Sequence, residues 1–93
     1  MMELRIFKNE DDYNKAVRNE ECVNCYRATV SAYEYTMHEN SPFRYTDSLG
    51  EKHLISPVDI AMVGRSHDII TVILNIDPAA SNYISWNDII VVD

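Results

Sequence analysis

The two cysteines form the sharpest chemical motif in the sequence. Cys22 and Cys25 are two residues apart, the spacing at which two thiolates can bind one zinc ion. The other ligands would have to come from the three histidines, which are His38, His53 and His67. No two of these have the spacing of a zinc-binding histidine pair. We therefore expect no bound metal or other cofactor, and we keep a zinc or small-ligand module on Cys22 and Cys25 as an alternative.

No other pattern points to catalysis. The chain has two glycines, too few for the phosphate-binding loops of nucleotide enzymes. The serines in turn-like settings, none of them in a nucleophile elbow, are Ser41, Ser48, Ser56, Ser66 and Ser81. Asp47 and Glu51 flank a predicted hairpin turn, where we expect solvated carboxylates with ordinary pKa values, a poor setting for general acid–base chemistry. The sequence therefore predicts that the protein is not an enzyme.

Negative charge is the strongest compositional signal. Fifteen acidic residues stand against eight basic ones, which gives a net charge of −7. No lysine or arginine follows Arg65, so the C-terminal part of the chain has few groups that could displace counterions from a nucleic acid. We expect a basic protein partner and no direct binding to nucleic acid or membrane. The competing interpretation is that the charge only keeps a small protein in solution.

Aromatic side chains lie among these acids, and a chain of this size cannot bury all of them. Exposed Tyr and Trp contribute contact area at low entropic cost and are enriched at protein–protein interfaces. The residues that we expect to contact the partner are Tyr33, Glu34, Tyr35, Asp77, Trp86 and Asp88. A further acidic run, residues 10–12, fits the start of a helix, and we prefer this capping role to imitation of phosphate groups.

The function that these features favour is protein binding without catalysis. The small size, the acidity and the eight Asn without a Gln are typical of phage or mobile-element proteins that antagonise host nucleic-acid-handling proteins. We expect an inhibitor that occupies a basic surface on such a protein, in the manner of anti-defence or DNA-mimic proteins. A self-assembling structural protein, whose exposed strand edge would build a homo-oligomer, is a further alternative.

The N-terminal residues lack the apolar stretch of a signal peptide, and the longest apolar runs are too short to span a bilayer. With no Asn-X-Ser/Thr acceptor, the sequence predicts a cytoplasmic protein with free thiols.

Length and composition indicate one α+β domain spanning residues 1–93. Ile and Val together number eighteen against four Leu, which favours strands because branching at Cβ restricts the side chain in a way that strands tolerate. We expect a curled antiparallel sheet or an open SH3-like barrel of five or six strands, with one helix near the N-terminus.

Local patterns place these elements. A strand over residues 4–7 precedes a helix that Asn9 caps and that ends near residues 19–21. Residues 26–37 read as a strand with a bulge at residues 32–33, and the alternative is a continuous helix over residues 11–37. The later segments predict a hairpin that pairs residues 43–46 with residues 52–55, and a strand over residues 68–76 that is buried on both faces.

Two later segments form an internal sequence repeat. Residues 55–63 and 84–92 share the pattern Ile-Ser-X-X-Asp-Ile-X-X-Val. We interpret both as strand, tight turn and strand, with residues 83–86 and 89–92 completing the sheet. For the first copy, a short helix over residues 57–63 remains an alternative.

Overall fold

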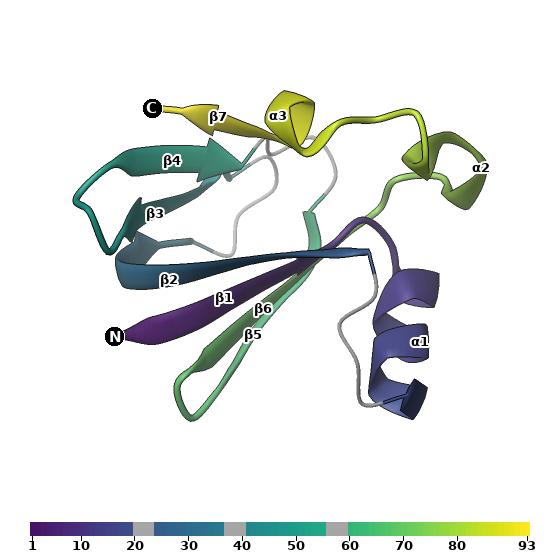
Figure 1. Ribbon diagram of the computed structural model, residues 1–93, viewed down its shortest axis with the longest axis horizontal. Helices are drawn as coiled ribbons and strands as arrows, with labels where there is room; N and C mark the ends of the chain where they lie inside the picture. The colour runs from purple at the N-terminus through teal and green to yellow at the C-terminus, as the bar shows by residue number, and fades with distance from the viewer. Residues whose placement is uncertain (20–23, 37–40, 56–59) are drawn as a thin grey trace.

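The computed structural model describes residues 1–19, 24–36, 41–55 and 60–93. These residues form one seven-stranded sheet in the order β5-β6-β1-β2-β3-β4-β7, with a helix after the first strand (Figure 1). The strands are β1 Met2–Phe7, β2 Cys25–Glu34, β3 Phe43–Asp47, β4 Lys52–Ile55, β5 Ile60–Ser66, β6 Ile69–Leu74 and β7 Ile90–Val92. The helices are α1 Glu10–Asn19 and the single turns α2 Pro78–Ser81 and α3 Trp86–Ile89.

The sheet is mixed and open. β1 pairs parallel to β6, whereas the other described neighbours pair antiparallel, and β5 and β7 form the two edges. The predicted α+β class with a dominant sheet and an N-terminal helix is confirmed. The expectation of five or six antiparallel strands is wrong, because the described residues form seven strands and β1 pairs parallel to β6. The sheet does not close into a barrel, because the edge strands β5 and β7 do not pair with each other in the described residues.

The core lies inside the curl of the sheet. Successive strand residues point to opposite faces, and Leu4, Val30 and Ile70 on the inner face are fully buried. A bulge keeps the inner face apolar along β2, since the register with β3 shifts between Val30 and Ala32 and so turns Tyr33 inward. The bulge lies beside its predicted position, and the strand assignment of β2 excludes the continuous-helix alternative for these described residues.

The early local predictions are confirmed. Asn9 caps α1 by accepting a hydrogen bond from the backbone N–H of Asp12 at 2.9 Å, and the helix ends at Asn19. α1 packs on the outer face of β1, where the rings of Phe7 and Tyr13 meet edge to face at 5.4 Å. The hairpin of β3 and β4 pairs Phe43 with Ile55, as expected.

The C-terminal segment differs from the prediction. Residues 83–86 form no strand; Ser85 instead caps α3 by accepting a hydrogen bond from the N–H of Asn87 at 3.2 Å. β7 confirms the last predicted strand over most of its length. In the first copy of the repeat, residues 56–59 lie outside the described part of the chain. Residues 60–63 belong to a strand, which contradicts the helical alternative for them. None of the helices in the described segments is long and apolar enough to cross a membrane.

Candidate functional site

The parallel pairing of β1 and β6 brings two distant loops together. Phe7 lies opposite Ile73 at the carboxyl ends of the two strands. Just beyond them, the N–H of Ile76 donates a hydrogen bond to the carbonyl of Lys8 at 3.0 Å. Because neighbouring parallel strands end at the same edge of a sheet, the start of α1 and the segment before α2 lie side by side.

A groove of about 220 Å³ lies between these two segments. We call it the acidic groove, and its lining residues are Asn9, Glu10, Asp11, Leu74, Asn75, Ile76, Asp77 and Pro78. Three of them carry exposed carboxylates, and none is a lysine or an arginine. The groove therefore combines negative charge with the apolar surface of Ile76 and Pro78.

Each of the three carboxylates also stabilises the start of a helix. Glu10 and Asp11 lie in the first turn of α1, where the helix dipole favours negative charge. Asp77 caps α2, since its Oδ1 accepts a hydrogen bond from the N–H of Ala79 at 2.9 Å. Its other oxygen, Oδ2, makes no hydrogen bond to the residues that the structure describes, so it can face a ligand.

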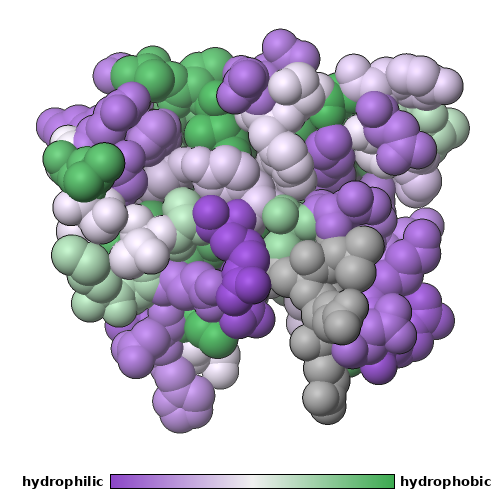
Figure 2. Space-filling model, in the orientation of Figure 1, coloured by the Kyte–Doolittle hydropathy of each residue, from purple (hydrophilic) through white to green (hydrophobic). Residues whose placement is uncertain are grey.

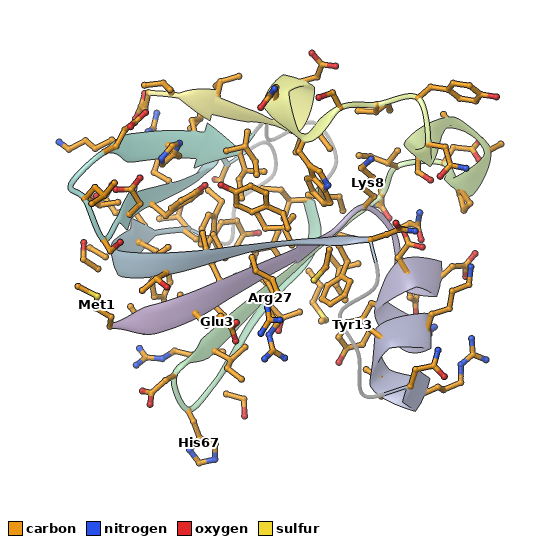
Figure 3. All side chains as sticks on the ribbon, viewed as in Figure 1. Met1, Glu3, Lys8, Tyr13, Arg27 and His67 are labelled. Atoms are coloured by element: carbon orange, nitrogen blue, oxygen red, sulfur yellow. The ribbon has the colours of Figure 1, made fainter. Side chains whose placement is uncertain are left out.

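The basic residue nearest in sequence points away from the groove. Lys8 reaches from the end of β1 toward the C-terminal segment (Figure 3), and its Nζ donates to the carbonyls of Ser81 at 2.8 Å and Ile84 at 2.6 Å. The same ammonium lies 5.0 Å from the centre of the Trp86 ring, in a cation–π contact. Lys8 is thus engaged by neutral groups, and in the described residues it forms no ion pair with a carboxylate of the acidic groove.

Three arginines are likewise paired elsewhere. Glu3 accepts from Arg5 at 2.8 Å and from Arg27 at 2.7 Å on the outer face of the sheet, where Glu3 and Arg27 lie together in Figure 3. Desolvation raises the pKa of Glu3, but the hydrogen bonds from Arg27 and Arg5 outweigh it and hold that pKa below 4.5. Arg44 pairs with Asp93 at 3.1 Å.

The surface differs from one region to another. Hydrophilic residues dominate the region around α1 in Figure 2, while apolar ones gather along the rim formed by β4 and β7.

The structure does not bring the six predicted contact residues to one surface. Asp77 lines the acidic groove. Tyr33 and Tyr35 are half-buried, with ring centres 5.7 Å and 6.1 Å from that of Phe43, so their rings serve mainly the core. Glu34 is exposed and lines a separate groove of about 150 Å³ together with Arg44.

The other two predicted residues lie in α3. Trp86 is half-buried, with its ring 5.7 Å from that of Tyr26, and Asp88 is exposed in the first turn. Sequence reasoning gave Glu10 and Asp11 a capping role and did not connect them with Asp77. Their charge is visible in the sequence, but their proximity to Asp77 arises from the pairing of β1 with β6.

A second polar cluster lies at the hairpin of β3 and β4. Asp47 Oδ2 is 3.0 Å from His53 Nε2, and a ligand atom of Glu51 lies within 4.8 Å of both. The hydrogen bond from His53, together with those from the N–H groups of Glu51 and Leu49, lowers the pKa of Asp47. The expectation of an ordinary carboxylate is therefore wrong at Asp47, because the turn folds back and surrounds it with donors.

Tyr45 closes the inner side of this cluster. Its ring stacks on His53 with centres 4.8 Å apart, and its hydroxyl donates to the hydroxyl of Tyr26 at 3.3 Å. Burial is the main cause that raises the pKa of Tyr45, and the carboxylates of Asp47 and Glu51 add to it. The hydroxyl therefore stays protonated.

The cysteine pair provides no thiolate site in the described residues. Cys25 begins β2, is half-buried and is not a free thiol, which differs from the expectation of free cysteines. Cys22 lies outside the described residues, so the predicted alternative of a ligand site on both cysteines is not tested.

The chain matches no protein-family model, no curated protein and no solved structure. The acidic groove and the hairpin cluster are therefore interpreted from their own geometry.

Proposed function

We propose that this chain is a non-enzymatic protein-binding domain whose acidic groove holds a basic segment of a partner protein. The observation that carries the proposal is the lining of the groove by three exposed carboxylates without a lysine or arginine. A lysine or arginine side chain suits such a site, because its aliphatic stem can pack on Ile76 and Pro78 while its charged end meets the carboxylates.

The expected energetics favour several weak contacts and fast association. An exposed ion pair contributes only about 0.2–1 kcal/mol, so three of them give a modest affinity. The net charge of −7 adds long-range attraction toward a basic surface, which raises the association rate and weakens with salt. A partner with a basic surface, such as a nucleic-acid-binding protein, meets both requirements.

The volume of the groove limits how far it can imitate DNA. A groove of about 220 Å³ suits one or two basic side chains better than the long row of contacts that a DNA duplex makes. In this proposal the domain inhibits a host protein by occupying part of its basic surface, as expected for a phage or mobile-element protein. The acids that line the groove, rather than the rings of Tyr33 and Tyr35, make the central contact.

A pair of matched triple variants tests the proposal. Both remove three negative charges: Glu10→Gln, Asp11→Asn and Asp77→Asn change the groove, whereas Glu34→Gln, Asp68→Asn and Asp88→Asn change exposed acids elsewhere. Asn at position 77 keeps a capping oxygen, so α2 should persist. The probe is a fluorescent Lys/Arg-rich peptide, and its affinity is measured by anisotropy at low and at near-physiological salt.

The groove variant should bind the peptide about 3- to 150-fold more weakly, from three contacts of about 0.2–1 kcal/mol each. The control variant should lose much less. Equal losses in both would show that net charge alone attracts the peptide, and a larger loss in the control would move the site to Glu34, Asp68 and Asp88. Either result contradicts the groove as the binding site. The mass of the domain in solution, measured without a partner, tests the self-assembly alternative.

A further inference from the structure

We propose that the hairpin of β3 and β4 binds a zinc ion through Asp47, Glu51 and His53. The donor atoms of these three side chains all lie within 4.8 Å of one another. Asp47 Oδ2 and His53 Nε2 are 3.0 Å apart, so a small adjustment of the two side chains lets both bind one ion at metal–ligand distances of about 2.0–2.2 Å. This site is separate from the acidic groove and does not depend on the proposed protein-binding function.

The turn holds two of the donors in place before any ion arrives. Asp47 Oδ1 accepts hydrogen bonds from the N–H groups of Leu49 and Glu51, each at 2.9 Å, which directs Oδ2 toward His53. The backbone closes the same turn, since the N–H of Asp47 donates to the carbonyl of Glu51 at 2.9 Å. Carboxylate ligands are commonly oriented by such outer hydrogen bonds, which keep one oxygen available to the metal.

The imidazole is fixed by packing. His53 stacks on Tyr45 at 4.8 Å, and its strand position lies opposite Val92 of β7. In the ion-free form Nε2 contacts Asp47. In the zinc-bound form the neutral ring carries its proton on Nδ1, and the lone pair of Nε2 binds the ion. The change therefore needs a tautomer shift and no movement of the strand.

The donor set favours zinc over the larger alkaline-earth ions. One imidazole nitrogen and two carboxylate oxygens suit a borderline cation, whereas calcium and magnesium prefer oxygen ligands throughout. The two carboxylates balance the charge of a divalent ion. The neighbouring base, Lys52, lies opposite Thr46 on the other face of the sheet, so its ammonium does not compete for the site. Glu51 is exposed, and water can complete the coordination.

The test titrates zinc chloride into the chelator-treated full chain by calorimetry. The wild type should bind one equivalent, and Asp47→Asn, Glu51→Gln and His53→Asn should each weaken binding roughly tenfold or more, the loss that a metal site shows when its ligand shell is damaged. Two matched controls remove the same groups elsewhere. They are His67→Asn, at a turn position with φ of 54° that asparagine tolerates, and Glu34→Gln. Both should bind zinc as the wild type does.

Circular dichroism shows whether each variant is folded, so that a loss of zinc binding can be assigned to the lost ligand. Glu51→Gln changes an exposed side chain that the fold does not need. Absence of saturable zinc binding by the wild type would refute the site, and so would unchanged affinity in folded His53→Asn. Cobalt supplies a further check, because a thiolate-to-cobalt charge-transfer band would place the ion on cysteine instead. A cobalt spectrum with nitrogen and oxygen ligation that His53→Asn abolishes would support the proposal.

Discussion

Replacing Lys8 by methionine should destabilise the protein more than any other change of a surface charge described above. The ammonium of Lys8 holds the C-terminal segment to the end of β1 through two carbonyls, those of Ser81 and Ile84, and the ring of Trp86. Methionine keeps most of the aliphatic length but removes the charge and the hydrogen-bond donors. The two carbonyls then lose a charged partner in a half-buried setting.

The magnitude follows from these contacts. Hydrogen bonds to a charged group contribute about 1.5–3 kcal/mol each, and a cation–π contact contributes about 0.5–2 kcal/mol. Desolvation of the ammonium and the release of side-chain entropy offset part of this total, so we expect a loss of roughly 2–4 kcal/mol. Such a loss is a large fraction of the roughly 5–15 kcal/mol that stabilises a typical domain.

Urea denaturation measures this effect directly. Trp86 is the single tryptophan, so its fluorescence reports on the contact itself, while circular dichroism reports on the sheet. Lys52→Met is the matched control, because Lys52 is exposed and should change stability by less than about 0.5 kcal/mol. A Lys8→Met protein as stable as the wild type, or an equal loss in Lys52→Met, would refute the anchoring role of Lys8.

Three further variants test other parts of the fold. Arg27 and Arg5 hold the pKa of Glu3 below 4.5, so this pairing stabilises the folded state above that pH and the stabilisation is lost as the pH falls through the folded pKa. Glu3→Gln should remove up to about 1 kcal/mol at neutral pH and weaken the fall of the unfolding free energy at acid pH, measured in urea. An unchanged dependence on acid pH would contradict the pairing. Asn9→Ala should lower the free energy of unfolding by about 1 kcal/mol through loss of the cap of α1, whereas Asn14→Ala, an exposed change within the same helix, should not destabilise the protein in chemical denaturation. Ile70→Ala should cost about 2–5 kcal/mol in the same assay because Ile70 is fully buried, and a loss below about 1 kcal/mol would show that the inner face of β6 is not core.

Elements with local signals could be predicted from the sequence. The Asn9 cap with its acidic first turn, the hairpin around Asp47 and the parity change in β2 each lie within a few residues of the bonds that form them. The failure at residues 83–86 had a local signal as well, since Ser85 followed by Asp88 is a typical helix start. The isoleucines on either side favoured a strand instead.

The pairing of β1 with β6 has no such signal. Both strands place apolar residues on the inner face of the sheet, and nothing in their residues specifies parallel pairing across more than sixty positions. The acidic groove depends on this pairing, because it joins Glu10 and Asp11 to Asp77. The hydrogen-bond acceptors of Lys8 are backbone carbonyls, which no residue type in the sequence indicates. The burial of a ring likewise depends on how the strands pack. Tyr33, Tyr35 and Trp86, which were chosen as contact residues from their type alone, are half-buried.

The position of β1 between β2 and β6 should also affect how the chain folds during translation. On the ribosome, β1 and β2 can pair early, but the second edge of β1 has no partner until residues 69–74 emerge. Through that interval β1, which is apolar on its inner face, has unpaired N–H and C=O groups that another chain could bind. Nascent chains released before residue 69 should therefore aggregate, and release after the final residue should restore a single, compact product.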